Sequence, residues 1–138
     1  MLGPELIFAT EMRVAIIDDD VDSREVLREF LSMSSYECEA FATGADAIAR
    51  HSDQPFDAVL VDLGLPENGL NVVTLLRVVG PTIAVIAYSG HGELRGAARD
   101  AGCDAFVLKP NVDDLEAELR QAELSLKARG TSRRGCRA

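Results

Sequence analysis

The chain has 138 residues, 47% of them hydrophobic, and a formal net charge of -9. That length suits one domain with a substantial core. The excess of carboxylates disfavours direct binding to nucleic acid or to an anionic membrane, because phosphate affinity requires clustered Lys and Arg. No apolar run is long enough for a transmembrane helix. Cys38, Cys103 and Cys136 lack metal-binding spacing, so we expect reduced thiols in a cytoplasmic protein.

Residues 1–11 are mildly apolar but lack the basic start and long apolar stretch of a signal peptide, so we expect an N-terminal extension. The first predicted strand starts at Met12 and runs into three consecutive aspartates, Asp18, Asp19 and Asp20. A helix should follow, capped by Asp20. Its apolar face is predicted to carry Val26, Leu27, Phe30 and Leu31.

Residues 36–41 predict a second strand, and a short helix over 43–50 should follow it. The start of that helix, Thr43-Gly44-Ala45-Asp46, resembles a capping box with Asp in place of the usual Glu. The next apolar run covers residues 56–61 and ends at Asp62, directly before the turn-like Leu63-Gly64-Leu65-Pro66. Asp62 is therefore expected to be the exposed last carboxylate of a buried strand.

The rest of the chain repeats the alternation. A helix is expected near Leu70 to Val79, a strand from Ile83 to Ser89, a helix near Glu93 to Ala101 that contains Gly96, and a strand from Ala105 that runs into Lys109-Pro110. A last helix should carry Leu115, Leu119, Ala122 and Leu126 on one face. We expect residues 12–128 to form the domain and residues 129–138 to form a basic, disordered tail.

Five strands that alternate with five helices predict an α/β fold, with right-handed crossovers and a parallel sheet covered on both faces. The near-continuous apolar strands agree, since a parallel sheet buried on both sides need not alternate. The carboxyl ends of parallel strands meet at one edge, so Asp18, Asp19, Asp62, Ser89 and Lys109 should converge there. Three carboxylates in one pocket are costly unless a divalent cation neutralises them, and Mg²⁺ favours oxygen ligands.

Together, Asp18-Asp19, Asp62, Ser89 and Lys109-Pro110 at successive strand ends resemble the receiver domain of two-component response regulators, the CheY-like family. The resemblance covers about residues 12–127. It implies a flavodoxin-like (βα)5 fold with strand order 2-1-3-4-5. It also implies that Asp62 accepts a phosphoryl group, and that Mg²⁺ or Mn²⁺ is held by Asp19, Asp62, the Gly64 carbonyl and, mostly through water, Asp18.

The resemblance implies roles for four further residues. Lys109 would neutralise charge beside Asp62, aimed by a cis peptide before Pro110. Ser89 would hydrogen-bond the phosphoryl group, and Phe106 would turn inward with it as a switch. His91 is a hypothesis for tuning dephosphorylation. The expected partners are a sensor histidine kinase or phosphotransfer protein and a downstream target protein. Residues 93–101, the strand from Ala105 and the last helix would form the output face and a possible homodimer contact.

Several alternatives stay open. Taken alone, Asp62 would be a cap or turn residue, and Lys109 a surface lysine. For Phe106 the favoured interpretation is a plain core residue, and for His91 a solvated loop residue. The loop after Pro66 is one residue shorter than the family pattern, so a degenerate receiver that only binds proteins is one alternative. A haloacid-dehalogenase-like phosphatase is another; it would use Asp18 and Asp20 and leave Asp62 without a role. We expect a signalling domain that catalyses only its own phosphotransfer and dephosphorylation.

Overall fold

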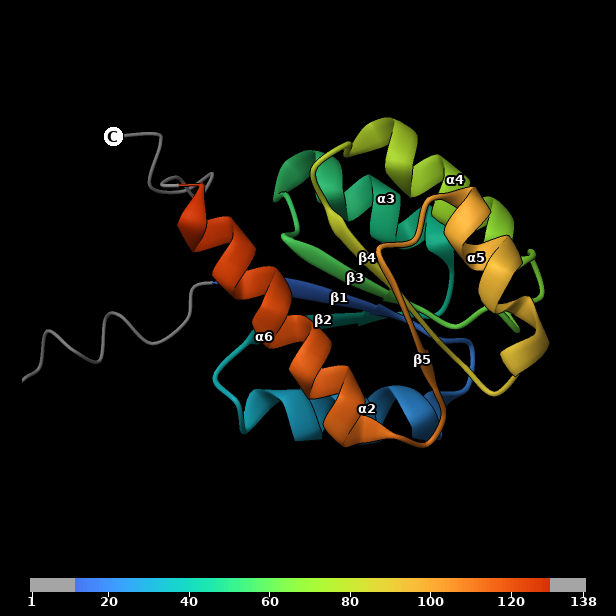
Figure 1. Cartoon of the computed structure of the whole chain (residues 1–138), viewed down its shortest axis with the longest axis horizontal. Coiled ribbons are helices and arrows are strands. Elements are labelled where there is room, and N and C mark those ends of the chain that lie inside the picture. Colours follow the sequence, from blue (N-terminus) through green and yellow to red (C-terminus); the bar gives the residue numbers. More distant parts are fainter. Residues whose placement is uncertain (1–11, 130–138) are drawn as a thin grey trace, which may run out of the picture.

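The computed structural model describes residues 12–129, in which five strands form one parallel sheet in the order β2-β1-β3-β4-β5 (Figure 1). The predicted extension 1–11 and nearly all of the predicted tail lie outside the described residues. The elements in chain order are β1 (Arg13–Ile17), α2 (Val21–Ser32), β2 (Glu37–Phe41), α3 (Gly44–Asp53), β3 (Ala58–Val61), α4 (Gly69–Val79), β4 (Ala84–Ser89), the 3-10 turn η1 (Gly92–Leu94), α5 (Arg95–Ala101), β5 (Ala105–Leu108) and α6 (Val112–Ala128). The predicted flavodoxin-like α/β fold is confirmed.

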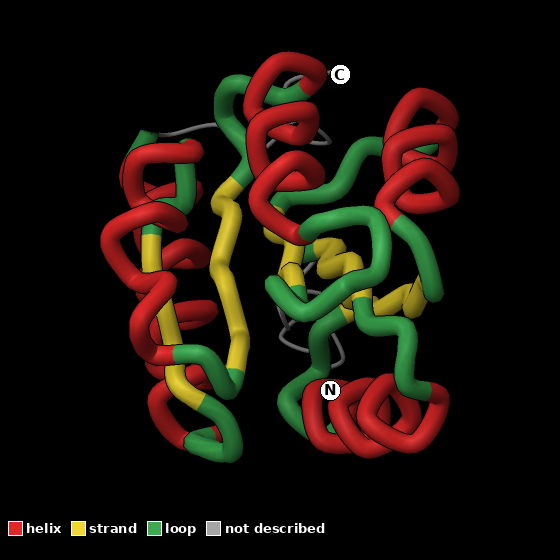
Figure 2. Tube along the Cα trace, turned by 90° about the vertical axis from the view of Figure 1, so that its right-hand side faces the viewer, coloured by secondary structure: helices red, strands yellow, loops and turns green. Residues whose placement is uncertain are grey.

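Helices cover both faces of the sheet. α2 and α6 lie on one face, and α3, α4 and α5 lie on the other (Figures 1 and 2). Successive residues of a strand point to opposite faces. In β1, Ala15 and Ile17 pack toward α3, α4 and α5, whereas Val14 and Ile16 pack toward α2 and α6. The sheet therefore separates two apolar layers, as its near-continuous apolar strands predicted.

Polar side chains cap the predicted helix starts. Asp20 accepts a hydrogen bond from the Ser23 N–H at the start of α2, and Thr43 accepts one from the Asp46 N–H at the start of α3. Both predicted caps are confirmed. The prediction for Val26 was wrong, since this residue is 62% exposed, whereas Leu27 and Leu31 are buried and Phe30 is partly buried against the same core. Val26 lies beside these residues, where solvent reaches it, so its apolar character did not indicate burial.

The predicted helix near Glu93 forms in two parts. η1 comes first, and α5 starts only at Arg95. Gly96 therefore lies in the first turn of α5 rather than in the middle of a helix. A Cβ added there would meet nothing within 4 Å, so close packing does not explain this glycine. Its remaining effect is to lower the helix propensity of α5.

At the amino-terminal edge of the sheet, two aspartates make the same pair of bonds. Asp57 precedes β3; its N–H donates to the Arg13 carbonyl at 2.8 Å, and its carboxylate accepts from the Arg13 N–H at 2.9 Å. Asp104 precedes β5 and bonds the backbone of Val85 in β4 in the same way, both at 2.8 Å. Each aspartate thus bonds the backbone N–H and carbonyl of the neighbouring strand, which would otherwise lack these partners.

Charged side chains at this same edge are matched. Arg13, which is buried, lies 3.1 Å from Glu37 and 3.3 Å from Glu39 and stacks over the Phe56 ring. Arg77 pairs with Asp104 at 2.9 Å. No helix within residues 12–129 has the length and apolar content that crossing a bilayer requires.

Candidate functional site

The carboxyl-terminal edge of the sheet gathers the predicted site residues from neighbouring strands. Asp18 follows β1 and Asp62 follows β3, and the last residues of those strands, Ile17 and Val61, are paired in register. The Asp62 N–H donates to the Ile17 carbonyl at 3.0 Å, which extends the pairing by one step. Strand pairing therefore brings Asp18 and Asp62 to adjacent positions although they are far apart in the sequence.

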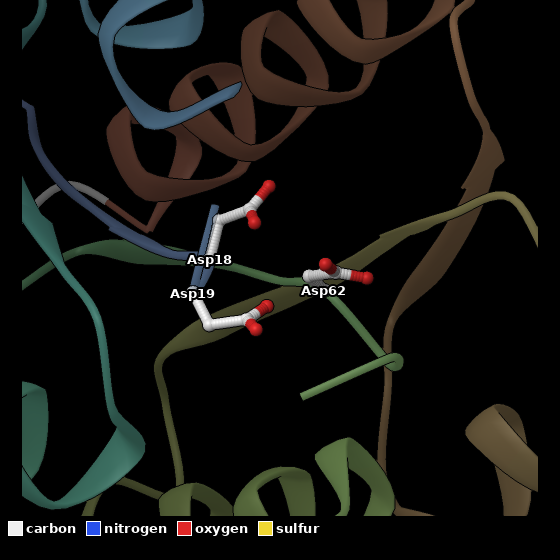
Figure 3. Close-up of side chains that lie close together, drawn as sticks. All are labelled: Asp18, Asp19 and Asp62. Carbon is white, nitrogen blue, oxygen red and sulfur yellow. The ribbon is translucent and has the colours of Figure 1, made fainter. Parts of the chain in front are cut away.

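Three carboxylates turn toward one space at this edge: those of Asp18, Asp19 and Asp62 (Figure 3). One oxygen from each lies within 4.8 Å of the others. Asp18 is buried, with 2% of its surface exposed, whereas Asp19 is open to solvent and Asp62 lies between these extremes. A ligand approaching from solvent would thus meet Asp19 and Asp62 first, with Asp18 behind them.

Lys109 supplies a positive charge at the cluster. Its Nζ lies 3.3 Å from Asp18 Oδ2 and 3.5 Å from Asp62 Oδ2, and it also lies over the Tyr88 ring. Burial alone would lower the pKa of Lys109, but attraction to Asp62 and Asp18 outweighs it and raises that pKa. Lys109 is therefore held in its charged form. The peptide bond between Lys109 and Pro110 is cis, as the resemblance implied.

Asp18 is fixed by the backbone and by Lys109. Its Oδ1 accepts from the Asp20 N–H at 2.9 Å, and its carbonyl accepts from Arg24 Nη1 at 2.8 Å. Burial raises the pKa of Asp18, the Asp20 N–H and Lys109 counteract that rise, and repulsion from Asp62 adds to it. For Asp18, one ammonium group thus falls short of offsetting burial and repulsion.

The loop after β3 places Gly64 beside Asp62. The Gly64 N–H donates to Asp62 Oδ1 at 2.9 Å, which orients the carboxylate. A Cβ at position 64 would lie 3.4 Å from Asp62 Oδ1 and 4.0 Å from His91 Nε2. Gly64 and His91 therefore border the same opening to Asp62.

Ser89 closes β4 and is fully buried. Its Oγ accepts a hydrogen bond from the His91 N–H at 3.0 Å, so the hydroxyl holds the start of the loop that leads to η1. The His91 imidazole is exposed, and its Nδ1 lies 3.5 Å from Glu93 Oε2. A movement of Ser89 toward Asp62 would break this bond and release the loop.

Phe106 lies in β5, next to Ala87 of β4, and is half-buried against the α3, α4 and α5 layer. The Arg95 guanidinium covers its ring at 4.7 Å from the centroid, within the range of a cation–π contact. Arg95 Nη1 also lies 3.4 Å from the Phe106 carbonyl. The ring is thus neither plain core nor free, and a contact from α5 holds it at the surface.

The donor set suits a hard divalent cation. Three aspartate carboxylates from two strand ends provide oxygen ligands of the kind that Mg²⁺ and Mn²⁺ prefer. The described residues around the cluster offer no cysteine or histidine ligand group that would indicate zinc. The residues present therefore fit Mg²⁺, and the same edge carries a lysine suited to a phosphoryl oxygen.

Comparison with known proteins agrees with this geometry. Residues 14–120 match the family described as the response regulator receiver domain. The chain belongs to this family. The predicted resemblance is confirmed over most of the described residues.

Relatives and solved structures extend the comparison. The chain is 35% identical over 113 residues to the transcriptional regulatory protein KdpE of Mycobacterium tuberculosis, covering 79% of this chain and 50% of that protein. It is 30% identical to PrrA of Mycobacterium bovis, covering 89% and 53%. The chain spans about half the length of these curated relatives. Its receiver fold matches the Thermotoga maritima response regulator TrrA in complex with Mg²⁺-BeF, with a TM-score of 0.75, 25% identity and coverage of 80% and 98%. It also matches a CheY-like receiver domain from Methylobacillus flagellatus, with a TM-score of 0.74 and 29% identity, covering 83% of this chain and 100% of that one.

Sequence reasoning missed two side chains near the site. Arg24 donates to the Asp18 carbonyl, and Arg95 covers Phe106. Arg24 lies six residues beyond Asp18, in the first turn of α2. Its contact with the end of β1 could therefore have been predicted from the start of that helix. Arg95 carried no such signal, because its contact depends on how α5 packs against β5.

Proposed function

We propose that this receiver domain accepts a phosphoryl group on Asp62 from a phosphohistidine of a sensor histidine kinase or phosphotransfer protein. The observation that carries the proposal is the juxtaposition of Asp62, Asp19, Asp18 and Lys109 at one edge of the sheet. The solved T. maritima response regulator TrrA, which is in complex with Mg²⁺-BeF, supports the same chemistry. Such a domain turns over no separate substrate; it catalyses only its own phosphorylation and dephosphorylation.

In the proposed reaction, an Asp62 carboxylate oxygen attacks the phosphorus. The new P–O bond forms as the P–N bond of the donor breaks, and the imidazole nitrogen keeps the bonding electrons and takes up a proton. The Gly64 N–H holds one oxygen of Asp62 at 2.9 Å, leaving the other to attack. Asp62 thereby becomes an aspartyl phosphate.

Charge neutralisation supplies most of the catalysis in such a transfer. Lys109 is 3.5 Å from Asp62 and would bind a phosphoryl oxygen once the group is in place. Asp19, Asp62, the Gly64 carbonyl and Asp18 would hold Mg²⁺, which would neutralise the remaining phosphoryl charge. Ser89 would give up the hydrogen bond that it accepts from the His91 N–H, and its hydroxyl would donate a hydrogen bond to another phosphoryl oxygen.

The output would follow from movement of Ser89. The loop from Ser89 to Gly92 would shift toward Asp62, and Phe106 would turn into the space released, leaving its contact with Arg95. The surface of α5, β5 and α6 would then differ between the two states and would bind a target protein or a second copy. We expect a cytoplasmic protein, and the net charge of -9 disfavours direct contact of this domain with nucleic acid.

Incubation with acetyl phosphate and Mg²⁺ tests the proposal. We expect one added phosphoryl group in the intact mass, base-labile and absent in Asp62→Ala, but retained in Asp20→Ala, since Asp20 caps α2. Lys109→Ala should be phosphorylated much more slowly. Steady release of phosphate that requires Asp18 and not Asp62 would instead support a phosphatase. No incorporation under any condition would leave a protein-binding module.

A further inference from the structure

A carboxylate from the loop after β3 reaches the first turn of α3. Glu67 Oε2 accepts a hydrogen bond from the Gly44 N–H at 2.6 Å, across 23 residues of sequence. The first N–H groups of a helix have no partner within the helix and carry a partial positive charge. A carboxylate that bonds one of them makes a short, charge-assisted contact. This contact joins α3 to the same loop that carries Gly64.

The α3 side of this contact is held in place by packing. A Cβ on Gly44 would lie 2.7 Å from the Val72 methyl carbons, so only glycine fits where α3 crosses the start of α4. Thr43 caps the same turn through the Asp46 N–H and has no part in the bond to Glu67. The Gly44 N–H is thus a fixed point on which the loop can be anchored.

The loop side is compact but exposed at its tip. Leu63 and Leu65 are buried, and Gly69 lies so close to the loop start that a Cβ there would be 2.5 Å from Leu63 Cα. Pro66, Glu67 and Asn68 face solvent, and Asn68 has the uncommon φ of 71°. The contact from Glu67 to Gly44 therefore secures the part of the loop that packing leaves open.

We propose that Glu67 is a positioning residue for Asp62. Its bond to Gly44 holds the loop in the conformation in which the Gly64 N–H orients the Asp62 carboxylate. Glu67 touches neither the phosphoryl group nor the metal ligands; it acts through Gly64, three residues away. This role rests on the proposed function.

The test compares Glu67→Ala with Thr43→Ala, which removes a cap from the same helix turn without touching the loop. Two readouts measure the site: Mg²⁺ affinity by titration calorimetry and phosphorylation rate with acetyl phosphate. Glu67→Ala should weaken Mg²⁺ binding by about tenfold, the size typical of losing a group that supports a metal site. Phosphorylation at subsaturating Mg²⁺ should slow by a similar factor. Thr43→Ala should leave the Mg²⁺ affinity and the phosphorylation rate near wild type, although it should lose at least as much folding stability as Glu67→Ala.

A third readout is independent of metal and of phosphorylation. Amide exchange at Gly64 in the metal-free protein should be on the order of fivefold faster in Glu67→Ala, as expected for loss of about 1 kcal/mol of local restraint. Glu67→Gln keeps an acceptor at the same reach and should restore most of the wild-type behaviour. Glu67→Asp keeps the charge but shortens the reach, and should resemble Glu67→Ala.

Three outcomes decide the matter. If Glu67→Ala and Thr43→Ala have the same Mg²⁺ affinity and the same Gly64 exchange, Glu67 is only a helix cap and the inference is overturned. If wild type takes up neither Mg²⁺ nor phosphate, the proposed function fails, and the exchange experiment still decides whether Glu67 holds the loop. If Glu67→Ala does not fold, the contrast between Glu67→Gln and Glu67→Asp gives the same decision.

Discussion

The two edges of the sheet handle charge in opposite ways. At the amino-terminal edge, Arg13 meets two glutamates and Arg77 meets Asp104. At the carboxyl-terminal edge, Lys109 pairs with Asp18 and Asp62, and Asp19 completes a cluster of three carboxylates. What differs is the supply of cations: Arg13, Arg50 and Arg77 pair with Glu37, Glu39 and Asp104, whereas Lys109 serves both Asp18 and Asp62.

Matched charges serve the fold, and unmatched ones indicate function. A buried arginine with several acceptors is costly to remove, because its partners lose their hydrogen bonds. A cluster of like charges is costly to keep, because the carboxylates repel and are partly desolvated. The carboxyl-terminal edge keeps that cost in the free domain and would recover it when a cation or phosphoryl group binds.

The largest expected effect lies at the matched edge. Arg13→Met should lower the free energy of unfolding by about 2–3 kcal/mol, because it removes the bonds to Glu37, Glu39 and two carbonyls from a buried position. Urea denaturation measures the change. Arg28→Met removes an exposed pair with Glu25 and should be nearly neutral. Equal effects of the two substitutions would show that the matched edge contributes no more than the surface.

Mg²⁺ should act on the other edge alone. At about ten times its dissociation constant it should raise the free energy of unfolding by about 1.4 kcal/mol, because it binds the folded state. Thermal denaturation with and without Mg²⁺ measures this shift. Arg13→Met should keep the full shift and Asp62→Ala should lose most of it; a shift that survives Asp62→Ala would place the ion elsewhere.

A smaller, pH-dependent effect is expected at Glu39. Burial would raise the pKa of Glu39, but hydrogen bonds and attraction from Arg50 and Arg13 outweigh it and lower that pKa. Its contribution to stability is therefore present above the ordinary pKa of glutamate and is lost as pH falls through the lowered folded value. Wild type should exceed Glu39→Gln in stability by less than about 1 kcal/mol at pH 7. Denaturation series from pH 7 to strongly acidic pH should show the gap closing; a constant gap would contradict the ion-pair origin.

The smallest expected effect has the opposite sign. Asp19→Asn should raise the metal-free stability by a few tenths of a kcal/mol, because it removes one exposed charge from a repulsive cluster. The same substitution should reduce the stabilisation by Mg²⁺. Paired denaturation curves with and without Mg²⁺ test both. Destabilisation without metal would mean that the three carboxylates are not in net repulsion.

Most of the fold and of the site could be predicted from short-range patterns. Apolar runs that end in Asp18, Asp62, Ser89 and Lys109 give both the strands and the convergence of their ends, since parallel strands share one direction. Contacts between helices and loops could not be predicted in this way. The bond from Glu67 to Gly44 and the cover of Arg95 over Phe106 depend on how separate elements pack, and nothing in the neighbouring residues encodes them. The exposure of Val26 shows the same limit for a single helix.

The paired bonds of Asp57 have a consequence for distance along the chain. They fix Asp57 against Arg13, so the four residues of β3 determine how far Asp62 projects beyond β1. One residue inserted between Asp57 and Asp62 would move the Asp62 carboxylate by about 3.3 Å and turn it to the opposite face of the sheet. The same insertion before Asp57 would leave the spacing between Asp57 and Asp62 unchanged. The position of Asp62 relative to Asp18 thus depends on the bonds of Asp57 at the opposite end of β3.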